Sequence, residues 1–502
     1  MYHTFASAKQ PTPDLAQIAS CPGLTASAAP HSLAVVEPDV GSLRRRALRA
    51  ALLLAGLAAL AGCQARREPN VLVVVIDALR PDHLGCYGYA RATSPTVDGL
   101  ARRGVLFADA TTVATYTRAS VPSIFTSVYP AAHGVLSQGT RVEVLADEYT
   151  TLAEALKARG YRTAAFMPNP SLHRVFKFGQ GFDLYDDDFA LGPGAADQAY
   201  ETASRINARF LRWLRSGRRA PFFAYLHYRD VHAPYVPPPP YDRMFAGAGP
   251  RRPLSAAEYQ AQPADLRSPR RFSDLGSYID QYDGEIRYTD DRLGELLATL
   301  RAEGLLDHTV VVVTADHGEA FLEHGAWTHG TDLYEEQTRV PLLLVLPDGA
   351  QGGRRVLSPV QTIDVYPTVL ALLGAPVSAQ VQGRSLLPTL DGRGDPHRPV
   401  FSEARVPRKK RPNGRGLLVS VRADGWKLIY NRTKRKAELY RVAEDPGEGN
   451  DLVAHLPQKA QELARLLQAF DQDNARHSHW QQGRQAVPQD VVEGLRALGY
   501  VQ

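Results

Sequence analysis

The stretch NVLVVVID, Asn70–Asp77, decides the fold of this 502-residue chain. Its valine-rich apolar run shows no polar alternation, as expected for a strand that is buried on both faces of a parallel sheet. The run ends in a carboxylate. Four further apolar runs follow along the chain and are expected to be strands of the same sheet: Tyr161–Phe166, Phe222–Leu226, Thr309–Thr314 and Val340–Leu346.

Segments with helical spacing of apolar residues separate these runs. The clearest are Thr96–Arg103, Thr151–Arg159 and Tyr278–Glu303. Gly160 and Gly304 directly follow the last two and are typical helix stops. Strands that alternate with helices at this spacing predict an α/β fold with an open, doubly wound sheet flanked by helices.

The alternation changes after about Gly374. Short runs separated by turns predict a small antiparallel sheet, followed by a helix at Gln458–Phe470 and a last helical piece around Val491–Leu498. The short runs are Pro399–Glu403, Leu417–Arg422, Trp426–Tyr430 and Ala437–Tyr440. We therefore expect four parts: a leader and signal peptide at 1–62, a catalytic α/β domain at 63–373, a C-terminal subdomain at 374–480 and a helical tail at 481–502.

The amino end has the pattern of a targeting segment. Arginines at 44–46 and 49 precede the apolar run Ala50–Ala61, which is too short to span a bilayer comfortably. The end of this segment, Leu-Ala-Gly-Cys at 60–63, resembles the signal of bacterial lipoproteins. The resemblance implies cleavage before Cys63, lipidation of its thiol, and a protein exported to the bacterial cell envelope and anchored in a membrane. An uncleaved helix is the alternative.

Composition and charge exclude several classes of protein. A hydrophobic fraction of 44% and a charged fraction of 22% are those of a globular protein. The net charge of +5 is small for this length, so no nucleic-acid partner is predicted. The basic run Arg405–Arg415 is read as a solvated loop. After removal of the leader only Cys63 and Cys86 remain, which excludes a cysteine metal cluster.

Polar side chains gather at the expected carboxyl ends of four strands. In an open α/β sheet, ligands bind at this edge. Each residue taken alone could be an ordinary loop residue, but two carboxylates and an imidazole at one edge suit a divalent metal ion. The residues are Asp77, Asn169, His227 with His232, and Asp316 with His317.

The stretch Val113–Gly134, VATYTRASVPSIFTSVYPAAHG, offers a reacting hydroxyl. Thr117, Ser120 and Ser123 lie at or near the start of a helix expected at Ala119–Thr126. A helix start attracts anions and favours the alkoxide form of a hydroxyl, although a plain N-cap has the same composition. We expect Thr117 to complete the metal site as the attacking group.

Several motifs in order along the chain resemble the sulfatases of the alkaline phosphatase superfamily. The resemblance covers about Asn70 to Leu467 and implies an α/β fold with a mixed sheet, a divalent metal ion (Ca, Mg, Mn or Zn), and hydrolysis of sulfate or phosphate esters through a covalent intermediate. The motifs are NVLVVVIDALRPDHLGCYG, SIFTSVYP, TLAEALKARGYRTA, HYRDVHAPY, TADHGEAFLEHG, LYEEQTRVPLLL and DGWKLIY with ELYRVAEDPGE.

The nucleophile position departs from the family. The sulfatase motif resembles Cys/Ser-x-Pro-x-Arg followed by Leu-Leu-Thr-Gly, and its first residue is oxidised to formylglycine. Aligning Ile124-Phe125-Thr126-Ser127 with the second half places Thr117 at the nucleophile and Val121 at the arginine. A second alignment places Ser120 at the nucleophile. We favour Thr117, which would act as an unmodified hydroxyl because its β-carbon carries a methyl group.

The resemblance also implies roles for the remaining residues. Ala78 stands where many sulfatases have a second aspartate, and His329 stands near an expected lysine. Asp77, Asp316 and His317 are then the metal ligands together with Thr117. His232 and His329 are expected to hold ester oxygens or to protonate the leaving group. Substrate-binding roles are expected for Ser120, Asn169, His227 and His324.

The leading interpretation is a lipid-anchored, metal-dependent hydrolase of sulfate or phosphate esters. Alternatives remain open. In a phosphotransferase of the same superfamily, an alcohol would replace water as the acceptor. In a phosphodiesterase, the substrate would be a phosphodiester. In an inactive homologue, the fold would be kept for binding alone, which the loss of the motif arginine would favour.

Overall fold

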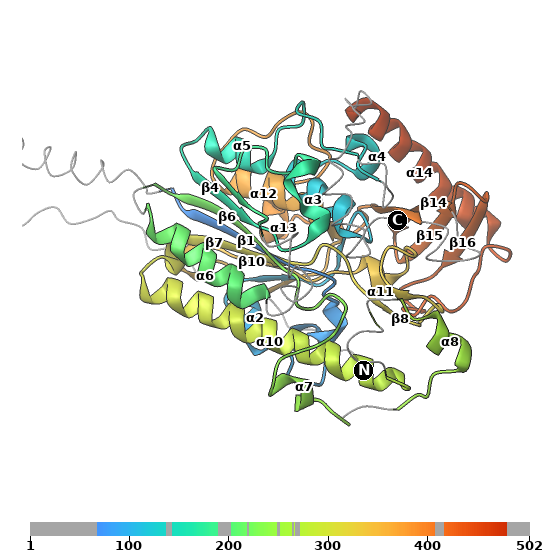
Figure 1. Ribbon diagram of the computed structural model, residues 1–502. Coiled ribbons are helices and arrows are strands. Elements are labelled where there is room, and N and C mark those ends of the chain that lie inside the picture. The colour runs from blue at the N-terminus through green and yellow to red at the C-terminus, as the bar shows by residue number, and fades with distance from the viewer. Residues whose placement is uncertain are drawn as a thin grey trace, which may run out of the picture. The chain divides into compact units, whose positions relative to one another are not determined.

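The computed structural model describes residues 68–136, 143–188, 202–217, 220–247, 251–263, 266, 272–406 and 416–478. These residues include an eight-stranded mixed sheet (Figure 1). Its strand order is β11 (Arg354–Val356), β2 (Val105–Phe107), β10 (Leu342–Val345), β7 (Thr309–Thr314), β1 (Asn70–Ile76), β6 (Phe222–Tyr228), β4 (Arg162–Phe166) and β5 (Leu184–Asp186).

The strand β10 is the one that makes this sheet mixed. It runs antiparallel to both β7 and β2, whereas every other neighbouring pair in the sheet is parallel. The carboxyl ends of β7, β1, β6 and β4 therefore meet at one edge. The predicted α/β fold is confirmed, and the four apolar runs that were expected to supply the site all lie side by side.

Helices cover both faces of the sheet (Figure 1). One face carries α3 (Thr117–Thr126), α5 (Leu152–Lys157), α12 (Val365–Leu372) and α13 (Leu387–Leu390), and the other carries α2 (Pro95–Arg103), α6 (Thr202–Arg215) and α10 (Leu275–Ala302). Shorter helices are α4 (Pro130–His133), α7 (Tyr241–Met244), α8 (Ala256–Ala261) and α11 (Glu335–Thr338). Two-residue strands pair β3 (Ala110–Thr111) with β12 (Val360–Gln361) and β8 (Ala320–Phe321) with β9 (Trp327–Thr328).

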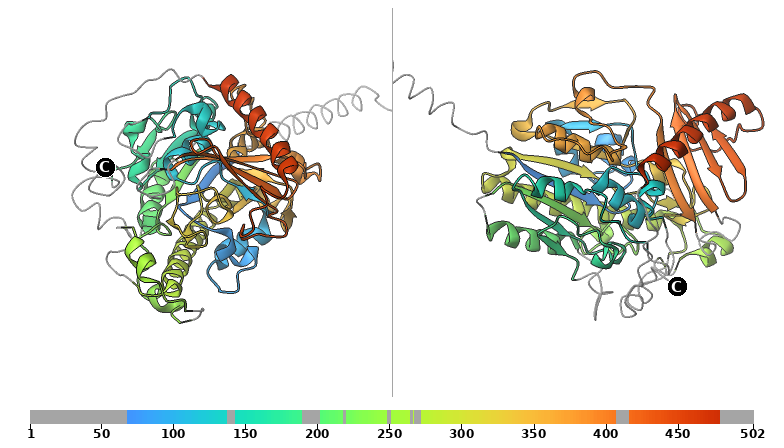
Figure 2. Two further views of the ribbon diagram at one scale, coloured as in Figure 1. Left: turned by 90° about the vertical axis from the view of Figure 1, so that its right-hand side faces the viewer. Right: turned by 90° about the horizontal axis from the view of Figure 1, so that it is seen from above.

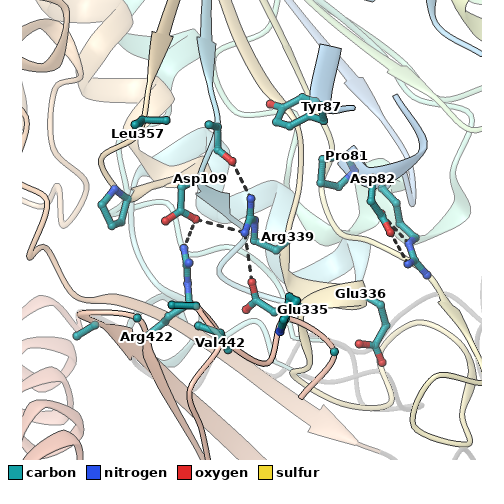
Figure 3. Close-up of a pocket in the computed structure, with 18 of the residues that line it drawn as sticks. Pro81, Asp82, Tyr87, Asp109, Glu335, Glu336, Arg339, Leu357, Arg422 and Val442 are labelled. Atoms are coloured by element: carbon teal, nitrogen blue, oxygen red, sulfur yellow. Dashed lines mark hydrogen bonds and ion pairs between the residues drawn. The ribbon is translucent and has the colours of Figure 1, made fainter. Parts of the chain in front are cut away.

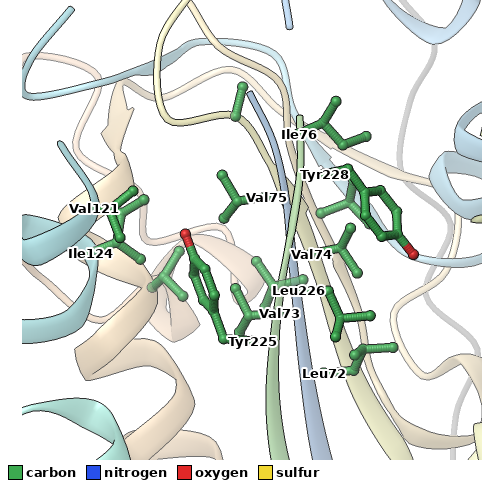
Figure 4. Close-up of a cluster of buried hydrophobic side chains, with 14 of the residues drawn as sticks. Leu72, Val73, Val74, Val75, Ile76, Val121, Ile124, Tyr225, Leu226 and Tyr228 are labelled. Carbon is green, nitrogen blue, oxygen red and sulfur yellow. The ribbon is translucent and has the colours of Figure 1, made fainter. Parts of the chain in front are cut away.

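The two central strands β1 and β6 are buried along their whole length, which explains their continuous apolar sequence. Side chains of a strand alternate between faces, and here both faces are buried. Val73, Val75 and Tyr225 point towards α3, where they meet Val121 and Ile124 (Figure 4). Leu72, Val74, Ile76, Leu226 and Tyr228 point to the opposite face. Each fully buried valine contributes about 1.5–3 kcal/mol relative to an exposed one.

The C-terminal part forms the expected antiparallel sheet. Its strands are β13 (Val400–Val406), β14 (Gly416–Ala423), β15 (Trp426–Asn431) and β16 (Lys436–Tyr440), paired in that order. The long helix α14 (Pro457–His477) lies across one face (Figure 2). Val419 and Val421 pack against Leu463 and Leu467 there. The other face of the C-terminal sheet packs on Leu333 and its neighbour Tyr334, which follow β9 in the chain.

Several expected boundaries differ from the structure. The helix predicted at Ala119–Thr126 begins two residues earlier, so Thr117 is its first residue instead of lying near the N-cap. The helix predicted at Tyr278–Glu303 begins at Leu275, because the Asp274 side chain caps it by accepting from the Ser277 N–H. His227 lies within β6 and not beyond its end.

Some predictions fall on residues outside the described part of the chain. These are the leader, Cys63, most of the basic run Arg405–Arg415 and the last helical piece around Val491–Leu498. Among the described residues, no helix combines the length and the apolar character needed to cross a bilayer.

Candidate active site

Asp77 is the centre of a buried polar cluster at the carboxyl edge of the sheet. It directly follows β1 and is fully buried. Its Oδ2 accepts a hydrogen bond from Asn169 Nδ2 at 2.7 Å and lies 3.2 Å from His227 Nε2. Burial by itself would raise the pKa of Asp77, but the charges of His232, His227 and His317 reverse that effect, so its pKa lies well below the ordinary value.

Asp316 and His317 reach the same point from the end of β7. Asp316 Oδ1 accepts from the Ala78 N–H at 3.4 Å and from the His317 N–H at 3.1 Å. Burial and the neighbouring Asp77 carboxylate raise the pKa of Asp316 above its ordinary value. Two carboxylates this close repel each other when both are ionised, and a cation between them would remove that repulsion.

The orientation of His317 leaves one nitrogen for a ligand. Its Nδ1 lies 2.9 Å from the Gly318 carbonyl oxygen, an acceptor, so the proton resides on Nδ1. The other ring nitrogen, Nε2, lies 3.4 Å from Asp77 Oδ1 and 3.5 Å from Asp316 Oδ2. Neither of these two buried oxygens accepts a hydrogen bond from any described residue.

These three residues fit a divalent metal ion. One ligand atom from each of Asp77, Asp316 and His317 lies within 4.8 Å of the others. Buried carboxylate oxygens without a hydrogen bond are costly unless something compensates their charge. Two such oxygens that converge with an imidazole lone pair are a donor set suited to a cation bound by oxygen and nitrogen.

Thr117 lies beside this group. It is the first residue of α3, and its Oγ1 is 3.2 Å from His317 Nε2 and 3.5 Å from Asn169 Nδ2. Ser120, the nucleophile in the second alignment, lies one turn further along α3. Its Oγ donates to the Thr117 carbonyl oxygen at 3.4 Å. Val121, at the position of the family's arginine, packs in the core (Figure 4).

His232 and His329 form a second layer over the cluster. The His329 ring stacks on the His317 ring, with centroids 4.2 Å apart, and meets the His232 ring at 4.8 Å. Both histidines are buried. The structure thus brings together Asp77, Thr117, Asn169, His227, Asp316 and His317, with His232 and His329 beside them.

His324 lies elsewhere. Its Nδ1 is 2.9 Å from Glu336 Oε1, its Nε2 is 3.2 Å from the Glu448 carbonyl oxygen, and its ring stacks on Tyr334. These contacts tie it to the C-terminal part, so the expected substrate-binding role is not supported by its position. Only four residues separate His324 from His329, yet His329 lies beside the cluster and His324 lies away from it.

Three residues without a predicted role support the cluster. The Tyr225 hydroxyl lies 3.3 Å from His227 Nδ1, on the side of the ring away from Asp77. The Tyr282 hydroxyl donates to the Ala78 carbonyl oxygen at 2.7 Å and accepts from the Arg80 N–H at 2.9 Å. Glu319 contacts His329. The sequence signalled only Glu319, as the last residue of the Asp-His-Gly-Glu motif.

A cavity of about 740 Å³ opens at the same edge, towards the C-terminal sheet (Figure 3). Asp109 lies between the guanidinium groups of Arg339 and Arg422, and Arg80 and Glu323 form another wall. None of the clustered residues lines this cavity. Its charged side chains largely pair with one another.

Comparison with known proteins identifies the family. The sulfatase family profile matches residues 69–375, and the profile of the C-terminal part of N-sulphoglucosamine sulphohydrolase matches residues 323–474. Together with the mixed sheet and the buried Asp-Asp-His group, these matches define the class of protein. The chain belongs to the sulfatase family of the alkaline phosphatase superfamily.

Curated relatives match to different extents. The chain is 32% identical to arylsulfatase K of Danio rerio over 189 residues, which is 36% of this chain and about a third (35%) of that protein. It is 24% identical to the uncharacterized sulfatase YidJ of Escherichia coli over 77% of this chain and 83% of that one. N-acetylglucosamine-6-O-sulfatase of Bacteroides thetaiotaomicron is 23% identical over 89% of this chain and 95% of that one.

Solved structures share the fold. A protein in complex with its substrate D-glucosamine-2-N,6-O-disulfate superimposes with a TM-score of 0.68 at 20% identity, over 82% of this chain and 99% of that one. Phosphonate monoester hydrolase of Agrobacterium radiobacter gives a TM-score of 0.65 at 22% identity, over 82% of this chain and 96% of that one. This fold therefore occurs both in a protein whose substrate is a disulfated glucosamine and in a phosphonate monoester hydrolase.

Proposed function

We propose that this protein is a metal-dependent hydrolase of sulfate or phosphate esters, phosphonate esters included, that works through a covalent intermediate on Thr117. The single observation that carries the proposal is the position of Thr117 Oγ1, 3.2 Å from His317 Nε2 within the buried group of Asp77, Asp316 and His317. A hydroxyl at the start of a helix and beside a cation site is placed to become a nucleophile.

The reaction would use the residues of the cluster as follows. A divalent cation held by Asp77, Asp316 and His317 would polarise an ester oxygen and lower the pKa of the Thr117 hydroxyl. Thr117 Oγ1 releases its proton to solvent and forms a bond to sulfur or phosphorus while the bond to the leaving oxygen breaks. His232 or His329 gives that oxygen a proton. In the second step a water molecule gives a proton to that histidine and its oxygen displaces Oγ1, which regains a proton from solvent. Sulfate, phosphate, a phosphate monoester or a phosphonate then leaves.

Outer contacts of Asp77 support this role. Asn169 and His227 both approach Oδ2, which leaves Oδ1 directed at His317 Nε2. Such hydrogen bonds orient a ligand and typically change metal affinity or activity by about 10–100-fold when they are lost. We assign Asn169 and His227 to orientation of Asp77 in addition to the substrate contacts expected from the sequence.

A substrate panel tests the proposal and its alternatives. Purified protein would be assayed with aryl sulfate, phosphate monoester, phosphodiester and phosphonate monoester substrates, each with Ca, Mg, Mn or Zn added. Release of sulfate, phosphate, a phosphate monoester or a free phosphonate, according to the substrate, indicates hydrolysis, whereas a product that carries an added alcohol indicates transfer. No turnover with any substrate and any of these metals would favour the inactive binding homologue.

The nucleophile is tested by three variants. Thr117→Ala should lower kcat by about 10³-fold or more, because removal of a covalent nucleophile costs several orders of magnitude. Thr117→Ser should keep part of the activity, since the hydroxyl remains. Ser120→Ala is the matched control on the same helix and should have a mild effect. The opposite result, an inactive Ser120→Ala and an active Thr117→Ala, would show that Ser120 is the nucleophile. Intact-mass analysis of the wild type should then show a loss of about two daltons from oxidation of that serine.

A further inference from the structure

Tyr225 and His227 lie on the same face of β6. Side chains two positions apart in a strand point to one face, and this face meets α3 (Figure 4). Both side chains are buried, and their rings are nearly parallel, with an angle of 21° between the planes and centroids 6.2 Å apart. Val73 and Ala165 lie beside Tyr225 on the neighbouring strands, and these smaller residues leave room for its ring.

The ring of Tyr225 is held between the sheet and α3. It meets the Phe125 ring edge-on, with centroids 4.8 Å apart, and packs with Val121 and Ile124 (Figure 4). A tyrosine side chain has only two torsions, so packing of the ring also fixes the position of the hydroxyl. The same helix begins with Thr117.

The two ring nitrogens of His227 face different partners. Nδ1 lies 3.3 Å from the Tyr225 hydroxyl, and Nε2 lies 3.2 Å from Asp77 Oδ2. An ionised carboxylate only accepts, so Nε2 carries a proton and donates to Asp77. In the part of the chain that the structure describes, Nδ1 is the only hydrogen-bond partner of the buried hydroxyl, so the hydroxyl donates to Nδ1. The contacts thus run from Tyr225 through His227 to Asp77.

A donor on Nδ1 determines how Asp77 is held. A neutral imidazole has one proton, and a hydroxyl that donates to Nδ1 keeps this proton on Nε2. Asp77 Oδ2 then accepts from both His227 and Asn169, the latter at 2.7 Å. Oδ1, which accepts from no donor among the described residues, lies 3.4 Å from His317 Nε2. Two donors on Oδ2 therefore orient the carboxylate so that Oδ1 is the oxygen offered to a cation.

We propose that Tyr225 is a positioning residue that acts through His227 to hold Asp77 Oδ1 towards the metal ion. This inference rests on the metal site of the proposed function and adds a residue that lies outside the family motifs. Without the hydroxyl, the proton of His227 can move to Nδ1, and the lone pair of Nε2 would then face Asp77 Oδ2. That contact is repulsive, so the carboxylate would turn and bind the cation less tightly.

The first test is Tyr225→Phe, which removes the hydroxyl and keeps the ring. After removal of bound metal with a chelator, Ca, Mg, Mn and Zn ions would each be titrated into the wild type and the variant by isothermal titration calorimetry. For the ion that the wild type binds most tightly, we expect the Kd to rise by about 3–10-fold, less than the rise of about 10–100-fold that follows loss of a direct partner of a ligand. An unchanged Kd would overturn the proposal.

The matched control is Tyr228→Phe on the same strand. Tyr228 is also buried, and its hydroxyl donates to Asn207 Oδ1 at 2.5 Å on the opposite face of the sheet (Figure 4). This variant therefore loses one buried hydrogen bond as well, but it should bind the ion with the Kd of the wild type. Equal weakening in both variants would indicate a general loss of packing and would refute the specific role of Tyr225.

A double variant tests whether Tyr225 acts through His227. His227→Ala removes one donor to Asp77 and should raise the Kd by about 10–100-fold. Adding Tyr225→Phe should cause no further rise, because the two changes interrupt the same chain of contacts. If the two effects add instead, the hydroxyl does not act through His227 and the proposal is wrong.

A measurement on the wild type covers the case that Tyr225→Phe does not fold. Proton–nitrogen correlation spectra of protein with isotope-labelled histidine, loaded with a diamagnetic ion (Ca, Mg or Zn), show which ring nitrogen carries the proton. The signals of His227 are those that are absent from His227→Ala. They should show a proton on Nε2 alone, and a proton on Nδ1 would contradict the proposal.

Failure of this inference and failure of the proposed function give different results. A wild-type protein that binds none of the four ions would overturn the proposed metal-dependent function, and this inference with it. A wild type that binds a metal ion, with an equal Kd in Tyr225→Phe, would overturn only the inference.

Discussion

Replacement of Glu403 by glutamine should stabilise the protein at alkaline pH. Glu403 lies on β13 and is only 2% exposed. Its Oε2 accepts from the Ala131 N–H at 2.9 Å, which joins the C-terminal sheet to α4. Burial raises the pKa of Glu403 from 4.5 to about 7, although the Ala131 N–H and the Arg432 charge act in the opposite direction.

The magnitude follows from this raised pKa. The folded protein keeps the proton up to about pH 7, whereas the unfolded chain releases it near pH 4.5, so the folded state binds more protons in this window. The free energy of unfolding therefore falls as pH rises through the window. At 1.36 kcal/mol for each pKa unit, the loss between pH 5 and pH 8 is about 2–3 kcal/mol. Glutamine retains an oxygen for Ala131 and has no charge to desolvate.

Urea unfolding at pH 5, 6, 7 and 8, followed by circular dichroism, measures this difference. The stability of Glu403→Gln relative to the wild type should increase by about 2–3 kcal/mol from the lowest to the highest pH. Glu444→Gln is the control, because its side chain is 65% exposed and pairs with Arg441 on the surface. A Glu403→Gln difference that stays constant over this range would refute the reasoning.

Three further predictions concern the site and the amino end. Tyr282→Phe leaves the Ala78 carbonyl and the Arg80 N–H without their buried partner, so the free energy of unfolding should fall by about 1–3 kcal/mol in thermal or urea unfolding; an unchanged value would mean that water replaces the hydroxyl. Asp316→Asn should lose most of the bound metal by elemental analysis, and wild-type stoichiometry in this variant would show that the ligands are misassigned. We propose that Cys63 is lipidated, so a fatty-acid probe should label the wild type in bacterial cells and not Cys63→Ser; equal labelling would contradict this.

Local sequence determined the strands and the edge at which the site lies. The apolar run of β1 and the runs of β4, β6 and β7 are long enough and continuous enough to be strands buried on both faces. Because parallel strands end at one edge, Asp77, Asn169 and Asp316 could be grouped from sequence alone. The resemblance to the sulfatase motifs added Thr117 to this group, at the position of the nucleophile.

Only the tertiary structure decided the direction of β10, since an apolar run has the same period in parallel and antiparallel pairing. It also decided which histidines reach the site: His324 and His329 lie in one loop, yet His329 stacks on His317 and His324 stacks on Tyr334. The supporting contacts of Tyr282 with Ala78 and Arg80 join residues about 200 positions apart. Sequence periodicity reports which face of its own element a side chain occupies, whereas these contacts depend on how separate elements pack, and no local pattern encodes that.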